Sequence, residues 1–156
     1  MKKLFVVFAV LFVLTACGGK ETVIINADYL VEEYVQQIPK NIPPGELTEY
    51  TDEYDLFITG SELYSQYVVF SANTEVDDFK FYVIAVPRGD IIEYHKGKPI
   101  LHYDKLSENR SLIIRMPMPE TLPWYGISYT DENGDTINYA IHCSGKDGSV
   151  ILEKFE

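Results

Sequence analysis

From residue 56 to residue 155, short hydrophobic runs alternate with turn-forming residues. Val, Ile, Tyr and Phe dominate the runs, and their spacing is roughly that of the strands in an all-β sandwich or barrel. The runs are LFI, QYVVFSA, FKFYVIAV, DIIEYH, PILHY, SLIIRM, YGISYT, INYAIHC and SVILEKF. This pattern predicts a mainly β fold, an antiparallel β-sandwich or meander.

Two tight turns make the end of the chain the clearest part of this pattern. Hydrophobic and polar residues alternate on both sides of Asn133-Gly134, a pair that readily adopts the positive φ angles of hairpin turns. The segment from Ser144 to Ser149 separates the next two runs in the same way. The last three strands are therefore predicted to form an antiparallel meander. A further turn is expected at Gly97-Lys98-Pro99, with His95 and His102 facing each other across a hairpin.

The pattern before residue 56 is different. Val23 to Ile25 is predicted as a first short strand, and residues 29–38 as one short N-terminal helix that Asp28 caps and Pro39 ends. Helical spacing places five apolar residues on one face of this segment, Leu30, Val31, Tyr34, Val35 and Ile38. A strand is the alternative, because Val and Tyr favour both structures. Residues 40–55 are predicted to be a loop because they contain prolines, a glycine and many charges.

The first 16 residues have the pattern of an export signal. Lys2 and Lys3 precede an unbroken apolar run from Leu4 to Leu14. A bilayer-spanning helix needs about 20 apolar residues, so this run is too short to span a membrane. It fits the apolar segment of a secretory signal, which has about 7–15 residues between a basic start and small residues.

Leu14-Thr15-Ala16-Cys17 resembles the lipobox of bacterial lipoproteins. The resemblance implies that Cys17 receives a diacylglycerol on its sulfur and that signal peptidase II cuts before it. It covers only about the first 20 residues and implies nothing about the rest of the chain. Residues 1–16 are then the signal peptide, 17–22 a lipidated tether and 23–156 one globular β-rich domain. An ordinary secreted protein with an incidental cysteine is the alternative.

The lipid would hold the protein in the bacterial envelope. Gly18 follows the cysteine, where enteric lipoproteins retained in the inner membrane tend to have Asp. The resemblance therefore implies the outer membrane in a Gram-negative host and the outer face of the plasma membrane in a Gram-positive one. If Cys17 carries lipid, Cys143 has no disulfide partner within the chain.

The mature chain is strongly acidic. Without Lys2 and Lys3 it carries 11 basic and 24 acidic residues, a formal charge of −13. Nucleic acid is excluded as a partner because binding to phosphates needs clustered Lys and Arg. Anionic headgroups should repel the domain. The charge serves solubility or meets a basic protein partner in the envelope.

No motif in the sequence supports an enzyme, a cofactor or a metal. Residues 131–142 begin like a calcium loop but have Thr136 and His142 where the loop requires Gly and Glu. Ser144-Gly145-Lys146 lacks the spacing of a phosphate-binding loop. His142 and Cys143 are adjacent in a predicted strand and so point to opposite faces, which argues against a cysteine nucleophile activated by this histidine. A non-catalytic binding or structural role is the resulting expectation, and an envelope hydrolase is the weakest alternative.

Residues 116–125, MPMPETLPWY, are the remaining candidate for a ligand site. The prolines favour an extended segment, and it ends in the only tryptophan, Trp124, beside Tyr125. Exposed aromatic rings in such a segment suit carbohydrate stacking or a protein contact. The competing interpretation is that Trp124 anchors the sandwich core while the prolines protect an edge strand.

Overall fold

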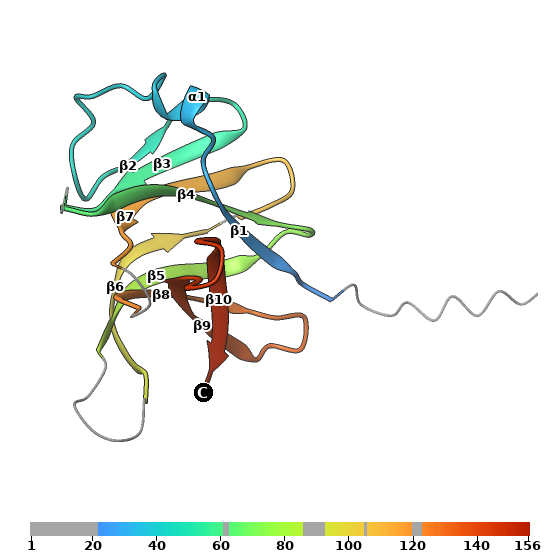
Figure 1. Ribbon diagram of the computed structural model, residues 1–156. Coiled ribbons are helices and arrows are strands. Elements are labelled where there is room, and N and C mark those ends of the chain that lie inside the picture. Colours follow the sequence, from blue (N-terminus) through green and yellow to red (C-terminus); the bar gives the residue numbers. More distant parts are fainter. Residues whose placement is uncertain (1–21, 61–62, 86–92, 105, 120–122) are drawn as a thin grey trace, which may run out of the picture.

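The hydrophobic runs form two five-stranded sheets in the computed structural model, which describes residues 22–60, 63–85, 93–104, 106–119 and 123–156 (Figure 1). In order, sheet 1 contains β1 (Ile25–Tyr29), β4 (Ser65–Ala72), β7 (Ser111–Pro117), β3 (Tyr54–Ile58) and β2 (Leu47–Glu49). Sheet 2 contains β10 (Val150–Phe155), β9 (Thr136–Cys143), β8 (Tyr125–Thr130), β5 (Asp77–Ala85) and β6 (His95–Tyr103). All paired strands are antiparallel except β3 and β7, which are parallel. The predicted mainly β, sandwich-like fold is confirmed.

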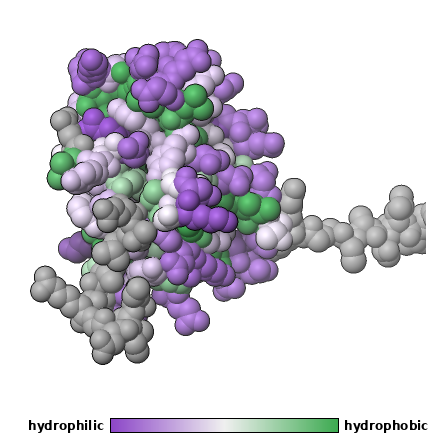
Figure 2. Space-filling model, viewed as in Figure 1, coloured by the Kyte–Doolittle hydropathy of each residue, from purple (hydrophilic) through white to green (hydrophobic). Residues whose placement is uncertain are grey.

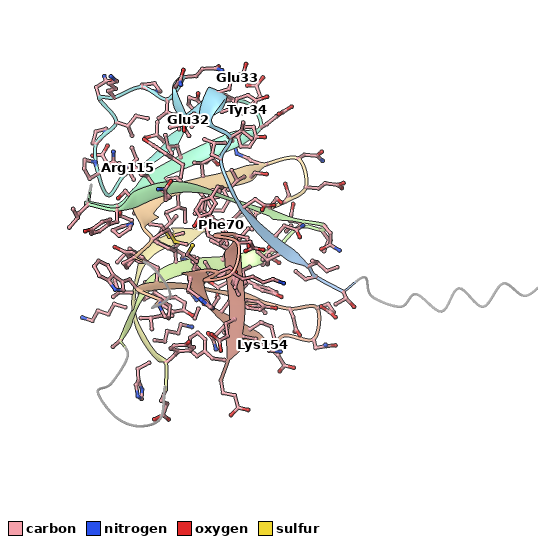
Figure 3. All side chains as sticks on the ribbon, viewed as in Figure 1. Glu32, Glu33, Tyr34, Phe70, Arg115 and Lys154 are labelled. Carbon is pink, nitrogen blue, oxygen red and sulfur yellow. The ribbon has the colours of Figure 1, made fainter. Side chains whose placement is uncertain are left out.

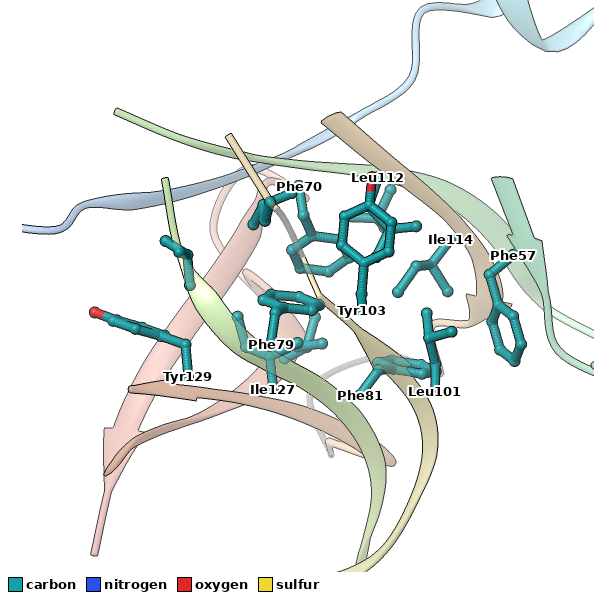
Figure 4. Packing of buried hydrophobic residues seen from close by; sticks show 14 of the residues in the cluster. Phe57, Phe70, Phe79, Phe81, Leu101, Tyr103, Leu112, Ile114, Ile127 and Tyr129 are labelled. Carbon is teal, nitrogen blue, oxygen red and sulfur yellow. The ribbon is translucent and has the colours of Figure 1, made fainter. Parts of the chain in front are cut away.

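An aromatic and aliphatic core fills the space between the sheets (Figure 4). Alternate residues of each strand point inward, so Phe70 of β4 meets Phe79 of β5 at a ring-centroid distance of 6.0 Å. Phe81 lies at 6.3 Å from Phe57 of sheet 1 and at 5.0 Å from Tyr125 of β8. Such ring pairs add to the hydrophobic stabilisation that comes from burying the rings themselves.

The two predicted hairpins and the meander of the last three strands are confirmed. β8 pairs with β9, and β9 pairs with β10. Gly134 in the first turn has φ +87° and Gly148 in the second has φ +75°, values that glycine adopts without steric cost. In the first turn, the Asp131 carboxylate accepts hydrogen bonds from the backbone N–H groups of Asn133 and Asp135, both at 2.9 Å.

The helix predicted for residues 29–38 is wrong in extent. The chain forms β1 up to Tyr29, and the helix α1 comprises only Glu32–Val35. Asp28 pairs with Val69 in the β1–β4 ladder, and Val31 at the helix N-cap makes no side-chain cap. Backbone pairing with β4 extends the strand, while Pro39 disfavours helical geometry at the residue before it. The helix is therefore confined to a single turn.

Two further predictions of turns and loops are also wrong. Gly97-Lys98-Pro99 lies inside the continuous strand β6, so His95 and His102 belong to one strand and do not face each other. β6 is an edge strand with irregular pairing to β5, and proline is tolerated at such edges and bulges. The predicted loop of residues 40–55 contains β2 and the first residues of β3. Residues 90–92 of the run DIIEYH lie outside the described residues.

A buried polar cluster joins the two sheets. Asp55 of β3 is only 6% exposed, and its carboxylate accepts a hydrogen bond from the Tyr103 hydroxyl of β6. The Arg110 guanidinium donates to both oxygens of the same carboxylate, with a distance of 2.8 Å from Nε to Oδ2. Burial would raise the pKa of Asp55, but the hydrogen bonds from Arg110 and Tyr103 outweigh it and hold the pKa below its usual value.

Candidate functional site

The outer face of sheet 1 is covered by residues 30–46, which we call the cover segment (Figure 1). Ile38 is buried against Leu56, Ile58 and Ile113, which point outward from β3 and β7. The Leu30 N–H donates to the Tyr67 carbonyl at 2.8 Å, and the Gly45 N–H donates to the Ile58 carbonyl at 2.8 Å. The cover segment is thus attached to the sheet at both ends and in the middle.

Residues 30–54, the cover segment with β2 and the β2–β3 turn, form what we call the acidic face. Six acidic side chains are exposed here and Lys40 is the single basic residue; the acids are Glu32, Glu33, Glu46, Glu49, Asp52 and Glu53. Glu32 and Glu33 project from α1 at the top of the molecule in Figure 3. Figure 2 shows hydrophilic residues over the same region, with hydrophobic ones between them. The exposed hydrophobic residues Val31, Tyr34 and Leu47 belong to this region.

The larger of two cavities under the cover segment has a volume of about 720 Å³. Its lining includes Tyr67 of β4 and Arg115 of β7, and on the side of the cover segment Gln36, Lys40 and Asn41. Two basic residues therefore line this cavity, beneath a surface that is rich in acidic side chains. Arg115 lies next to Tyr67 and Ile58 in the pairing of the central strands.

The second cavity, of about 370 Å³, lies between α1 and the β2–β3 turn. Three tyrosines line it, Tyr34 from α1, Tyr50 from the end of β2 and Tyr54 from the start of β3. Leu30 and Ile113 contribute apolar surface, and the remaining lining residues are Gln37, Thr51, Asp52 and Glu53. The cavity is aromatic and acidic, in contrast to its larger neighbour. Ile113 and Arg115 lie two residues apart on β7. Ile113 lines the smaller cavity and Arg115 lines the larger one.

The turn that carries Tyr50 and Tyr54 is fixed by its own hydrogen bonds. The backbone N–H groups of Tyr50 and Thr51 both donate to the Tyr54 carbonyl at 3.0 Å. The Thr51 hydroxyl accepts from the N–H groups of Glu53 and Tyr54 at 3.2 and 3.1 Å. Ser111 of β7 donates its N–H to the Glu53 carbonyl at 2.8 Å. Both tyrosines are therefore held in place relative to sheet 1.

Trp124 and Tyr125, the residues predicted for ligand binding, point in different directions. Trp124 is 46% exposed, so the interpretation that it anchors the sandwich core is wrong. Tyr125 is partly buried and stacks on Phe81 in the core, which leaves it no role as a surface platform beside Trp124. Pro117 ends the central strand β7 and does not protect an edge.

At its end of the sandwich, Trp124 lies next to a partly buried residue, Met118. It lines a small crevice with Met118, and the Met118 N–H donates to the carbonyl of Tyr64 at 3.0 Å. Tyr64 is 68% exposed, with a backbone φ of +54° that is unusual for a residue with a side chain. Tyr64 precedes β4, whereas β1 starts beside the other end of β4, at Ala72. This end of the sandwich is therefore remote from Ile25, where β1 begins.

The two cysteines differ in what the structure describes. Cys17 lies outside the described residues. Cys143 is a free, partly buried thiol whose sulfur lies 3.3 Å from the Gly148 carbonyl oxygen. Its neighbour His142 instead contacts Glu153 of β10, with 3.3 Å from Nε2 to Oε2. His142 and Cys143 thus have different polar partners, although both residues line the same small crevice as Trp124.

The outer face of sheet 2 carries a group of polar contacts that the sequence did not indicate. Asp78 has φ +56° and binds both the Lys80 ammonium and, at 2.7 Å, the His102 ring nitrogen Nε2. Lys96 contacts the Ser128 hydroxyl and the Asn138 side-chain oxygen, and lies 5.1 Å from the Tyr82 ring centroid. Each charged group here has a partner on the same sheet, which fits a structural role.

Within the described parts of the chain, no group of three or more His, Cys, Asp or Glu side chains is arranged to hold a metal ion. A search of the same residues finds no helix with the length and hydrophobicity needed to cross a membrane.

Comparison with protein-family models, curated proteins and solved structures finds no match to the chain.

The acidic face is the site that the sequence analysis missed. Its signal was present, because residues 30–54 contain six acidic residues and one lysine, but they were interpreted only as a helix and a loop. The three tyrosines of the smaller cavity are separated by up to 20 positions in the sequence, and their convergence depends on how the cover segment packs on sheet 1.

Proposed function

We propose that the protein is a lipid-anchored module of the bacterial cell envelope that binds a basic protein partner through its acidic face, without catalysing a reaction. The observation that carries the proposal is the concentration of six exposed acidic residues, against one lysine, in residues 30–54. The cover segment packs on sheet 1 through its own apolar cluster, so these charges belong to a fixed surface. The lipobox at Cys17 supports the membrane attachment.

The charge of the face determines how such binding would behave. At physiological ionic strength the Debye length is about 8 Å, so charges spread over one face act together only on a partner close to it. Complementary charge raises the association rate and favours the correct orientation of the partner. Anionic headgroups would repel the same face and keep it directed away from the membrane surface.

Neutralising the acidic face should weaken capture of the partner about tenfold. The change is the triple variant Glu32→Gln/Glu33→Gln/Glu46→Gln, and each exposed charge is expected to contribute about 0.5 kcal/mol. The measurement uses the mature domain without its lipid as bait for detergent-solubilised envelope of the host, at low and high salt, with quantification of the retained protein.

The matched control removes the same charge elsewhere, as Asp77→Asn/Asp135→Asn/Glu156→Gln, three residues that are all exposed. It should retain the partner. Equal weakening in both variants would mean that only net charge matters, and capture that is indifferent to salt would contradict the electrostatic mechanism.

A second candidate function, binding of carbohydrate or another small ligand, is favoured by the exposure of Trp124 beside Met118. Exposed indole and phenol rings provide flat apolar surfaces on which a sugar ring can stack. As the single tryptophan, Trp124 reports on its surroundings without interference from another indole. Titration with soluble cell-wall fragments should then shift its fluorescence emission. An unchanged spectrum at millimolar ligand would exclude this function.

A further inference from the structure

We propose that the smaller cavity of the acidic face, lined by Tyr34, Tyr50 and Tyr54, binds an alkylammonium group, the side chain of a lysine of the partner protein. The inference deepens the proposed function and rests on it for the source of the ligand. The cavity, of about 370 Å³, lies near the lower end of the range of about 300–1,000 Å³ for small-ligand sites. That size suits one extended side chain better than a large ligand.

The aromatic lining favours a cation. The face of a tyrosine ring carries negative electrostatic potential and attracts an ammonium within about 6 Å of the ring centroid. Leu30 and Ile113 provide apolar surface that the methylene groups of a lysine side chain can cover. An amphipathic cation therefore matches both kinds of surface in this cavity.

The charge of the lining also favours a cation. Its described residues include the carboxylates of Asp52 and Glu53, and no lysine, arginine or histidine. Arg110 reaches the backbone carbonyl of Asp52, but its guanidinium is held by both oxygens of Asp55. The larger cavity, in contrast, is lined by Arg115 and Lys40 and, among its described residues, by no carboxylate. The charge pattern thus directs a lysine to the smaller cavity.

The backbone that carries the three rings is fixed before any ligand arrives. Tyr50 and Tyr54 flank a turn closed by backbone hydrogen bonds of 3.0 Å and tied to β7 through Ser111. Tyr34 lies on α1, whose cover segment is anchored by the buried Ile38. A cavity formed in advance loses less conformational entropy on binding, so a weak contact such as a cation–ring interaction can contribute to affinity.

The first experiment tests the chemistry of the cavity without the partner. The lipid-free domain is titrated with N-acetyl-lysine amide and, separately, with N-acetyl-norleucine amide, whose side chain has no ammonium, while backbone amide signals are followed by NMR. The lysine probe should shift signals of residues 30–37 and 50–54, and the norleucine probe should shift them much less. Equal shifts with both probes, or none with the lysine probe at millimolar concentration, would overturn the proposal.

Two substitutions of Tyr34 test whether the face of its aromatic ring binds the ligand. Tyr34 is 55% exposed, so its replacement should leave the fold intact. Tyr34→Leu removes the aromatic face and should weaken lysine binding about fivefold, whereas Tyr34→Phe keeps it and should bind as the wild type does. Tyr64→Leu, which alters an exposed tyrosine outside this cavity, is the matched control. If Tyr34→Phe weakens binding as much as Tyr34→Leu, the hydroxyl and not the ring face binds the ligand, and the proposal fails.

The partner experiment separates this inference from the proposed function. If Tyr34→Leu releases the captured partner as well as the free lysine probe, the lysine of the partner occupies the cavity. If the partner is captured equally by wild type and Tyr34→Leu while neutralisation of the acidic face still releases it, the proposed function stands and this inference is overturned. If the probe binds but no partner is captured, the proposed function fails and the assignment of the ligand to a partner lysine fails with it.

Discussion

Asp55→Ala should lower the free energy of unfolding by about 3 kcal/mol. The Asp55 carboxylate is buried between the sheets and accepts hydrogen bonds from Tyr103 and Arg110. Removing one partner of a buried ion pair typically destabilises a protein by about 3–5 kcal/mol, because the other charge loses its compensation. The lower end applies because the Arg110 side chain is 35% exposed and keeps part of its hydration. Denaturant unfolding of both proteins at neutral pH measures the difference.

The pH dependence of this loss has a defined sign. The folded-state pKa of Asp55 lies below its value of about 3.9 in the unfolded chain. The stabilisation is therefore complete above the unfolded pKa and is lost as the pH falls through the lower, folded pKa. The difference between wild type and Asp55→Ala should be largest at neutral pH and shrink in strong acid. Asp135→Asn, an exposed control, should change stability little. A difference that grows on acidification would contradict the role given to the ion pair.

Cys17→Ser should move the protein entirely from the membrane fraction to the soluble fraction. Each buried methylene group contributes about 0.8 kcal/mol to membrane attachment, and stable anchoring takes more than one acyl chain. The diacylglycerol implied at Cys17 supplies two such chains, so its loss should abolish attachment. Membrane fractionation of cells grown with labelled palmitate measures both the location and the lipid.

Cys143→Ser is the matched control for lipidation, since Cys143 lies within the domain, in β9. It should stay in the membrane fraction and carry the label. A Cys17→Ser protein that remains attached to membranes, or that is still labelled, would contradict the lipoprotein assignment.

The strands and hairpins could be predicted because their signals are local. Seven predicted runs coincide with β3, β4, β5, β7, β8, β9 and β10 to within a few residues. Asn133-Gly134 predicted the turn, although only Gly134 of the pair adopts a positive φ angle.

The errors arose where tertiary contacts decide the local structure. Residues 29–38 have helical spacing, but pairing with β4 takes the chain through Tyr29 as a strand, and Val31 and Tyr34 stay exposed. Gly97-Lys98-Pro99 reads as a turn, yet it fits an edge strand because irregular pairing with β5 accommodates it. The parallel pairing of β3 with β7, distant in sequence, has no local signal.

The candidate site could likewise be predicted only where its signal is local in the sequence. The number of acidic residues in 30–54 could be read from the sequence, whereas the surface that presents them requires the packing of Ile38 on Leu56 and Ile113. The exposure of Trp124 could have been inferred, since Tyr125 begins a strand and neighbouring residues alternate in direction. The convergence of Tyr34 with Tyr50 and Tyr54 could not, because it depends on the path of the cover segment.

Crosslinking in intact cells tests the proposed function most directly. A photoreactive amino acid is placed in the full-length protein at Glu33 on the acidic face or, as a control, at Asp135 in the β8–β9 turn, both exposed positions. Irradiation should join the Glu33 variant to one basic envelope protein, and the yield should fall when Glu32 and Glu46 are also neutralised. The Asp135 variant should give no such product. Absence of a product from Glu33, or the same product from both positions, would contradict a partner-binding role for the acidic face.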